Sequence, residues 1–327
     1  KIGFIYIGPP GDHGWTYMHD QGRQDIEIDL GFETTYIENV PENADAVRAI
    51  RKLAASGHDL IFTTSFNYMD QTHEVAKEFP NVKFEHATGY IRSENVATYS
   101  SRFYEGRTIA GHIAGKESKT GVVGYIASFP IPEVVRGINS FMLAAQKVNP
   151  DIKVKIIWAF TWYDPGKEAD AAQTLINQGA DIIVQHTDTY APCQVAQKNG
   201  VKAFGQASNQ YDFCPDAHLT AIIDEWGPYY VARAKAVADG TWEPIDTWKG
   251  LDSGMVEMAP YRNMSPETKY EAIALENALR SGEIHSFEGP IYNQQGELMV
   301  AEGEVAPDGM LLGMDWYVQG IDGELPQ

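Results

Sequence analysis

The sequence predicts an α/β protein built from two similar lobes, and an internal repeat is the first reason. Residues 48–64 read RAIRKLAASGHDLIFTT and residues 172–188 read AQTLINQGADIIVQHTD. In each copy an amphipathic helix closes at a glycine, an aspartate follows, and an apolar run ends in polar residues. Glycine suits the left-handed position that ends a helix, and the apolar run suits a strand buried on both faces of a parallel sheet. Two copies half a chain apart therefore predict two related lobes.

Strand and helix patterns alternate along most of the chain, which is typical of doubly wound parallel sheets with right-handed crossovers. The first series of expected elements is strand 2–7, helix 16–30, strand 32–38, helix 42–56, strand 59–64, helix 69–79, strand 82–87 and strand 96–99. The second series is helix 104–116, strand 121–127, helix 133–148, strand 153–160, helix 166–178, strand 181–186, helix 191–199, strand 201–205 and strand 219–223.

The last third of the chain, after residue 224, predicts that the chain crosses between the lobes several times, as in a hinge. A helix over 226–239 should return to the first lobe, extended chain with turns should follow, and a further helix spans about 266–281. We therefore expect lobe 1 to contain 1–101 and about 225–250, and lobe 2 to contain 102–224. Residues 251–327, whose end shows only short strand patterns, should be shared between lobe 2 and the hinge.

Composition excludes several classes of protein. The chain has 327 residues, 43% of them hydrophobic, and a formal net charge of −20. It is long enough for two cores, and no apolar run approaches the ~20 residues that a membrane helix needs. A strongly acidic chain does not suit a phosphate backbone or an anionic membrane surface. We expect a monomer whose direct partners include no nucleic acid.

Catalytic and metal-binding signatures are weak. The sequence contains no GxSxG, Walker A, HExxH or GxGxxG motif, and its nine histidines include no pair four residues apart. The glycine-rich GPPGDHG (8–14) lacks the lysine of a P-loop and is interpreted as a tight strand-to-helix turn that presents backbone N–H groups. We therefore predict a protein that is not an enzyme and holds no cofactor and no metal.

Large aromatic residues follow several of the expected strands. Trp15 follows the first strand, Phe66 and Tyr68 follow strand 59–64, and Trp162 and Tyr163 follow strand 153–160. Loops at the carboxyl ends of parallel strands are where α/β proteins bind ligands, and they usually carry small polar residues. Rings at these positions favour stacking on a flat small molecule, most of all for Trp15 and Trp162.

The two cysteines, Cys193 and Cys214, lie in loops after neighbouring expected strands. If those strands are parallel neighbours, the loops come close together, and a disulfide is compatible with an oxidising compartment. Two separate, partly buried thiols fit the sequence equally well. No CxxC or Cys/His zinc spacing is present.

Five segments match a known family nearly end to end. They are DHGWTYMHDQG (12–22), RFYEGRTIAGHIAG (102–115), GVVGYIASFPIPEVVRGINSFMLAAQKVNP (121–150), WYDPGKEADAAQTLINQGADIIVQ (162–185) and FEGPIYNQQGEL (287–298). With them the chain resembles the basic membrane protein (BMP) family of substrate-binding proteins for ABC importers, relatives of purine-nucleoside receptor lipoproteins. The resemblance implies a type I periplasmic-binding-protein fold and delivery of a ligand to a membrane permease. It also implies a periplasmic or extracellular location, usually with a lipid on a Cys in a removed N-terminal segment.

The resemblance also implies particular site residues. In nucleoside-binding relatives the base lies between two aromatic rings, one from each lobe. The family's Asp-x-Ser-Phe-Asn motif falls on residues 12–16, so Trp15 takes the first ring position. The aromatic residue two positions before the family's Asp-Pro falls on Trp162, and the acidic residue before the Ala-Gly helix falls on Glu105.

Two departures from the family's pattern bear on the ligand. The Asp that ends the first strand in nucleoside receptors has no counterpart in the Tyr-Ile-Gly of residues 6–8. The Asp expected to hold the ribose hydroxyls has become Ala207, and a carboxylate is the natural acceptor for two adjacent hydroxyls. A free purine base such as adenine is therefore favoured. The alternatives are a purine nucleoside, a flavin or another flat heterocycle.

Polar residues at strand ends are candidates for reading the edges of such a base. They are Asn67, Glu105, Asp188 and Asn209, with His13 as a weaker candidate. For the two asparagines a turn-forming role explains the pattern equally well. Two other functions are alternatives. A purine-processing enzyme such as a nucleosidase needs a cluster of reactive groups, and a transcription regulator needs a helix-turn-helix before the first strand; neither is present in this sequence.

Overall fold

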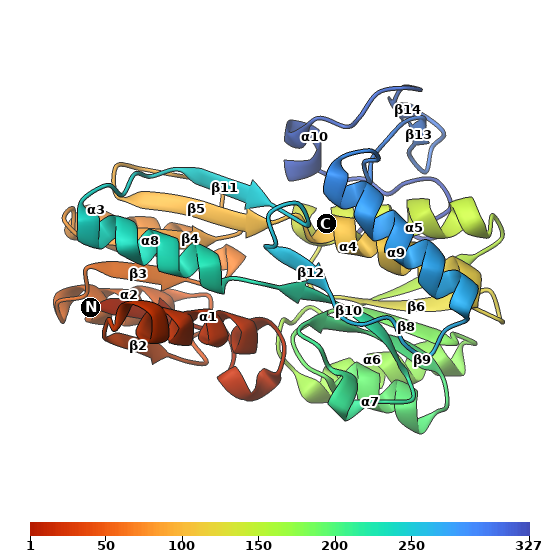
Figure 1. The fold of residues 1–327 in the computed structure, drawn as a ribbon, viewed down its shortest axis with the longest axis horizontal. Helices are drawn as coiled ribbons and strands as arrows, with labels where there is room; N and C mark the ends of the chain where they lie inside the picture. The colour runs from red at the N-terminus through yellow and green to blue at the C-terminus, as the bar shows by residue number, and fades with distance from the viewer. The chain divides into compact units, whose positions relative to one another are not determined.

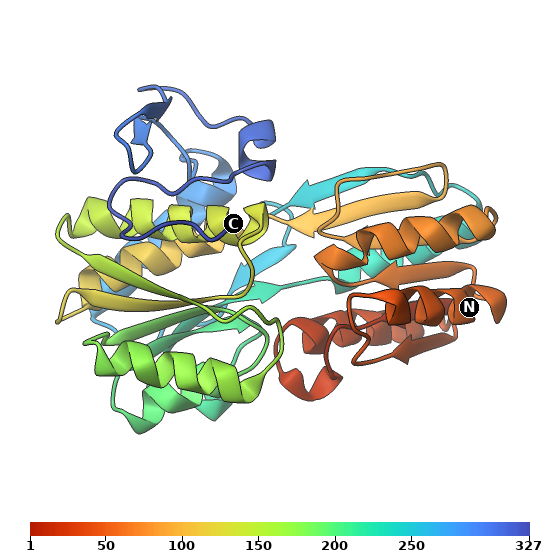
Figure 2. The same ribbon diagram turned by 180° about the vertical axis from the view of Figure 1, so that it is seen from behind.

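The computed structural model describes residues 1–327 and divides the chain into two compact units (Figures 1 and 2). Unit 1 consists of Lys1–Ser101 and Asp224–Lys249, and unit 2 of Arg102–Ile223 and Gly250–Gln327. Each unit contains one six-stranded sheet with helices on both faces. The α/β class expected from the alternating pattern is confirmed.

Unit 1 is built on a sheet whose strands run in the order β11-β5-β4-β3-β1-β2, and its strand pairs are parallel. The strands are β1 (Ile2–Ile5), β2 (Thr34–Ile37), β3 (Leu60–Thr63), β4 (Lys83–Ala87), β5 (Val96–Ser101) and β11 (Asp246–Lys249). Helices cover both faces, as Figures 1 and 2 show from opposite sides. They are α1 (Trp15–Leu30), α2 (Ala44–Ala55), α3 (Met69–Glu78) and α8 (Gly227–Asp239).

The two faces of this sheet bury different kinds of side chain. Under α2 and α3 the core is mainly aliphatic, with Ile5 and Ile61 from the strands meeting Ile50 and Val75 from the helices. Under α1 and α8 it is aromatic, and Phe4 stacks on Phe62 at 4.7 Å between ring centroids. Each fully buried side chain of this size contributes about 1.5–3 kcal/mol relative to an exposed one.

Unit 2 repeats the arrangement with the strand order β12-β10-β9-β8-β6-β7. The strands are β6 (Val122–Ala127), β7 (Lys153–Trp158), β8 (Ile182–His186), β9 (Lys202–Ala207), β10 (His218–Asp224) and β12 (Val256–Met258). On one face lie α4 (Phe103–Glu117), α5 (Pro132–Val148) and α9 (Pro266–Ser281), and on the other α6 (Pro165–Asn177) and α7 (Ala191–Lys198) (Figure 1). Helices α4 and α5 pack closely because residue 111 is a glycine: a Cβ there would lie 2.2 Å from the carbonyl oxygen of Phe141.

The internal repeat occupies the same place in both units. Its first copy forms α2 and β3, and its second forms α6 and β8; β3 lies beside β1 as β8 lies beside β6. Gly57 and Gly179 have φ angles of 83° and 98°, the left-handed conformation that their sequence context predicts.

The last residues form a small antiparallel pair, β13 (Ile291–Tyr292) and β14 (Leu298–Val300), and a short helix, α10 (Asp308–Leu312). The short strands were expected, whereas α10 was not, since a five-residue helix carries almost no periodic signal. The expected strand 153–160 ends earlier, at Trp158, because Phe160 has a φ of 51°. None of the helices is both long and apolar enough to span a membrane.

Candidate ligand-binding site

The loop after β1 begins the candidate site of unit 1, and Asp12 organises it. One carboxylate oxygen of Asp12 accepts hydrogen bonds from the backbone N–H groups of Gly14 and Tyr17 at 2.8 and 2.9 Å, and the other accepts from Thr16 at 3.0 Å. An acidic side chain at a helix N-terminus satisfies donors that the helix itself cannot. Within the glycine-rich turn 8–14, the N–H of Gly14 is therefore engaged by Asp12, and the N–H of Asp12 donates to the carbonyl oxygen of Pro9 at 3.1 Å.

Trp15 is held in one orientation at the ends of β1 and β3. Its indole Nε1 donates to the carbonyl oxygen of Thr64 at 2.7 Å. The ring meets His19 edge-on at 4.4 Å and Trp226 edge-on at 5.7 Å between centroids. A half-buried ring with a fixed edge is well suited to present a face to a planar molecule.

Trp226 and His19, which support Trp15, were missed in the sequence. Trp226 is fully buried and stacks on His19 at 4.8 Å with an interplanar angle of 11°. His19 Nδ1 hydrogen-bonds the Tyr230 hydroxyl, and burial lowers the pKa of His19 well below its usual value. Trp226 follows the expected strand 219–223, so the criterion that singled out Trp15, a large ring after an expected strand, also applies to Trp226.

In unit 2, Trp162 lies in the loop after β7. Its ring contacts Phe129 at 5.5 Å and His186 at 5.9 Å between centroids. Its carbonyl oxygen accepts a hydrogen bond of 2.9 Å from the backbone N–H of Asp188, which ties this loop to the end of β8. The indole Nε1 is buried and has no hydrogen-bond partner within the protein.

Glu168, the last residue of WYDPGKE (162–168), connects two loops of unit 2. Its side chain is fully buried, and Oε1 accepts from the backbone N–H and the hydroxyl of Thr189 at 2.9 and 3.0 Å. Its Oε2 accepts from the backbone N–H of Asp164 at 3.1 Å, while the Asp164 side chain caps α6 through Lys167 N–H. Burial raises the pKa of Glu168. One carboxylate thus joins the loop of Trp162 to the loop of Asp188.

Comparison with known proteins places this arrangement in a family. The family model described as ABC transporter substrate-binding protein PnrA-like matches residues 1–289. The chain belongs to this family. The resemblance seen in the sequence is thereby confirmed, and the family implies a small-molecule ligand, an ABC permease as partner, and work on the extracellular or periplasmic side of the membrane.

Two relatives cover nearly the whole chain. A purine-binding protein of Brucella abortus (strain 2308) is 58% identical over 100% of this chain and 94% of its own length. A candidate ABC transporter glucose-binding protein of Haloferax volcanii, TsgA13, is 34% identical over 99% of this chain and 80% of its own.

Solved structures share the fold. An ABC transporter solute-binding protein from Aeropyrum pernix K1 has a TM-score of 0.77 at 18% identity, covering 87% of this chain and 92% of that one. A second, from Conexibacter woesei, has a TM-score of 0.69 at 21% identity, covering 87% and 97%. The expected periplasmic-binding-protein fold is confirmed.

In this substrate-binding protein the two candidate carboxylates have different surroundings. Asp188 is buried beyond the end of β8. Glu105 lies in the first turn of α4, where its Oε1 accepts from the backbone N–H of Leu251 at 3.3 Å. Burial raises the pKa of Glu105 to about 7, so that this carboxyl changes charge near neutral pH.

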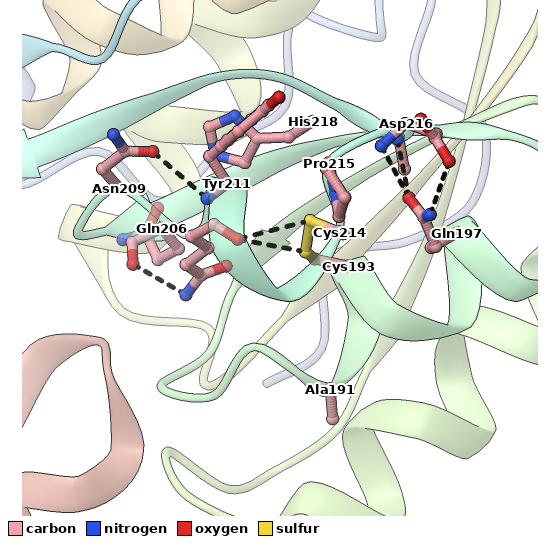
Figure 3. The surroundings of a disulfide bond; sticks show 12 residues. Ala191, Cys193, Gln197, Gln206, Asn209, Tyr211, Cys214, Pro215, Asp216 and His218 are labelled. Carbon is pink, nitrogen blue, oxygen red and sulfur yellow. Dashed lines mark hydrogen bonds between the residues drawn. A yellow bond between two sulfur atoms is a disulfide. The ribbon is translucent and has the colours of Figure 1, made fainter.

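The asparagine candidates are engaged within their own units. The Asn67 amide donates to Glu42 Oε2 at 3.2 Å, and its backbone N–H donates to Glu42 Oε1, also at 3.2 Å. Asn209 Oδ1 accepts from the backbone N–H of Tyr211 at 3.2 Å, as an asparagine does in a turn (Figure 3). The Asn209 contact favours the turn-forming alternative for that residue, whereas the bonds of Asn67 tie its loop to Glu42.

Phe66 and His13 lie in the loops after β3 and β1. Phe66 opens a short 3₁₀ turn, and its ring is 6.2 Å from that of Tyr90. His13 has a left-handed backbone with φ 52° and its ring is 5.1 Å from Tyr17. Trp15, Phe66 and His13 thus lie where the parallel strands of unit 1 have their carboxyl ends.

The structure joins Cys193 and Cys214 by a disulfide with a Cα–Cα distance of 5.8 Å (Figure 3). β8 and β9 are parallel neighbours, so the first turn of α7, which carries Cys193, meets the segment after β9 that carries Cys214. Both sulfur atoms lie near the carbonyl oxygen of Gln210, at 3.9 and 3.6 Å. The Gln210 amide donates in turn to the carbonyl oxygen of Gln206 at the end of β9. The disulfide therefore braces the loop that follows β9 and carries Asn209. The described residues contain no cluster of His, Cys, Asp or Glu that could hold a metal.

Proposed function

We propose that this substrate-binding protein captures a purine, most favourably a free base such as adenine, and delivers it to its permease. The observation that carries the proposal is the 58% identity, over the whole chain, with a protein named as purine-binding. The aligned region covers the whole chain and therefore includes all five segments that carry the family resemblance.

The base would stack between Trp15 and Trp162. Both rings follow strands at the carboxyl ends of their own sheets, and both are held by neighbours within their own unit. Base–aromatic stacking contributes roughly 1–3 kcal/mol per face. Closure on the ligand would then shift the protein toward the state that the permease recognises.

Carboxylates would read the edge of the base. Asp188 and Glu105 are the leading candidates, because an ionised carboxylate accepts from an amino group or a ring N–H. With its raised pKa, Glu105 can also donate a hydrogen bond when protonated. Phe66 and His13 would contribute from unit 1, while Asn67 and Asn209 would act mainly through the loops they stabilise.

A free base is favoured over a nucleoside because no carboxylate stands where a ribose would be held. Ala207 is fully buried, with φ 65°, and its methyl group offers no acceptor to sugar hydroxyls. The Tyr6 hydroxyl at the end of the first strand donates to Asp20 at 3.0 Å and is therefore engaged. We propose binding without catalysis, since neither tryptophan loop contains a paired nucleophile and base.

Native mass spectrometry of the purified protein, followed by mass identification of any species released on denaturation, tests this function. Release of adenine or another free base supports both the clamp and the absence of a ribose site. A released nucleoside would keep the purine assignment and overturn the argument from Ala207.

Calorimetry with adenine, adenosine, riboflavin and glucose on ligand-free protein complements that measurement. We expect adenine to bind more tightly than adenosine. Binding of glucose or riboflavin with no binding of any purine would refute the proposed function.

A further inference from the structure

His186 is the last residue of β8. One of its ring nitrogens contacts a carboxylate, and the other has no hydrogen-bond partner within the protein. The side chain is 5% exposed, and its Nε2 lies 3.3 Å from Oε1 of Glu133, which is itself 8% exposed. The opposite nitrogen, Nδ1, is buried and has no hydrogen-bond partner within the protein. Neither residue was selected in the sequence.

The protonation of His186 beside Glu133 determines whether Nδ1 donates or accepts a hydrogen bond. Burial lowers the pKa of His186 and outweighs the hydrogen bond to Glu133, which raises it, so the ring is neutral near pH 7. A neutral imidazole carries a single proton, and a carboxylate can only accept. The proton therefore lies on Nε2, facing Glu133, and Nδ1 is left as a pure acceptor. A buried acceptor without a donor is costly and calls for an explanation.

The position of the ring supplies that explanation. His186 pairs in register with Ala127 at the end of β6. The next residue, Ser128, also has a buried hydroxyl without a protein partner. The His186 ring lies 5.9 Å from that of Trp162, the proposed stacking residue of unit 2. Two buried polar atoms without protein partners, His186 Nδ1 and the Ser128 hydroxyl, therefore lie at the carboxyl ends of two neighbouring strands. This is where α/β proteins bind ligands.

We propose that His186 Nδ1 accepts a hydrogen bond from an N–H group on the edge of the bound base, and that Glu133 is a positioning residue that holds the required tautomer. This inference rests on the proposed function and deepens it. It makes the end of β8 a specificity-determining element that rejects flat ligands with only acceptors at that edge, because the acceptor would then stay unpaired.

The decisive experiment compares ligands that lack one N–H group at a time. Calorimetry would measure adenine, purine, which lacks the amino group, and 9-methyladenine, which lacks the imidazole N–H. In the wild-type protein we expect at least one analogue to bind about tenfold or more weakly than adenine. In the His186→Phe variant, which has no ring nitrogen, that penalty should disappear while weaker stacking-driven binding persists.

His218→Phe is the matched control. His218 is another buried histidine in the sheet of unit 2, and neither of its ring nitrogens has a hydrogen-bond partner. It lies at the start of β10 and therefore at the opposite end of the sheet from His186. Its replacement should leave the ratio of affinities for adenine and the analogues unchanged. Penalties that persist in His186→Phe overturn the inference. A wild-type protein that binds no purine refutes the proposed function itself.

A spectroscopic measurement remains decisive if His186→Phe fails to fold. The imidazole ¹⁵N shifts of the wild-type protein should show His186 with its proton on Nε2, and adenine should shift Nδ1 in the direction of an accepted hydrogen bond. Glu133→Leu should give a mixture of tautomers and a smaller discrimination between adenine and the affected analogue. Protonation on Nδ1 in the wild-type protein, or an Nδ1 signal indifferent to adenine, would overturn the inference.

Discussion

The indole Nε1 of Trp15 donates a hydrogen bond of 2.7 Å to the carbonyl oxygen of Thr64. The two residues are 49 positions apart, and the bond joins the start of α1 to the end of β3. Because the ring is also packed edge-on against His19 and Trp226, its plane is set before any ligand arrives. Preorganisation of this kind lowers the entropy lost on binding.

Replacing Trp15 tests this relationship. Trp15→Ala removes the stacking face and should weaken adenine binding about 5- to 150-fold, which corresponds to roughly 1–3 kcal/mol. Trp15→Phe keeps an aromatic face but loses the bond to Thr64, so its loss should be smaller. Calorimetry measures both. Trp158→Phe, on a half-buried tryptophan that donates to the Tyr317 hydroxyl, is the control; equal effects of Trp15→Ala and the control would contradict the assignment.

Glu105 should make folding stability depend on pH. Its pKa is raised from 4.5 to about 7 by burial, so between these values the folded state holds a proton that the unfolded state has released. The free energy of unfolding should therefore fall as pH rises from about 4.5 to 7, and Glu105→Gln should flatten that part of the profile. Urea unfolding at several pH values measures it, with exposed Glu94→Gln as control. An unchanged profile in Glu105→Gln would exclude this contribution.

Glu85 should be the most sensitive polar residue of unit 1. Its fully buried carboxylate accepts from Arg233, from the Tyr229 hydroxyl at 2.7 Å and from the Trp242 indole at 2.9 Å. Glu85→Ala leaves Arg233 as a buried charge without its counter-ion and should lower the free energy of unfolding by about 3–5 kcal/mol. Denaturant titration measures the loss.

The surface pair of Arg51 and Glu78 provides the comparison. Glu78→Ala should change stability little, because solvent screens the two charges. Similar losses in Glu78→Ala and Glu85→Ala would show that burial does not determine the contribution of these pairs.

The disulfide should contribute measurably to stability. It closes a loop with a sequence separation of 21, for which loop entropy predicts about 3 kcal/mol. The double variant Cys193→Ala/Cys214→Ala should unfold at lower denaturant concentration. A reducing agent should shift the wild-type transition in the same direction and leave the variant where it is. A wild-type transition indifferent to reduction would show that the bond does not constrain the unfolded chain.

Much of the fold could be predicted because its signals are local. The aliphatic face of α2 and the glycines that end α2 and α6 lie within single elements, and periodicity reports them directly. The positions of Trp15 and Trp162 at strand ends follow from the alternation of strands and helices alone. Family resemblance then added the expectation that the two rings serve one ligand.

The candidate site was harder to predict from the sequence because the contacts that support it join residues far apart in the chain. Asn67 is bonded to Glu42, 25 positions away, and the sequence around Asn67 does not indicate this partner. Trp226 supports Trp15 from a segment more than 200 residues further along the chain. His186 gained its significance only from Glu133, which lies on a helix and carries no local sign of its role.

The sequence by itself determined the α/β class, the two repeated units, the strand-end tryptophans and the family, because these depend on spacing and residue type. Only the tertiary structure decided which polar atoms have a hydrogen-bond partner and which buried ones have none. Asp12 proved to be a helix cap, Glu168 to join two loops, and His186 to have a buried Nδ1 with no hydrogen-bond partner. Hydrogen-bond partners come from segments distant in the chain, and burial alone makes an unpaired group costly, so neither could be deduced before the chain was folded.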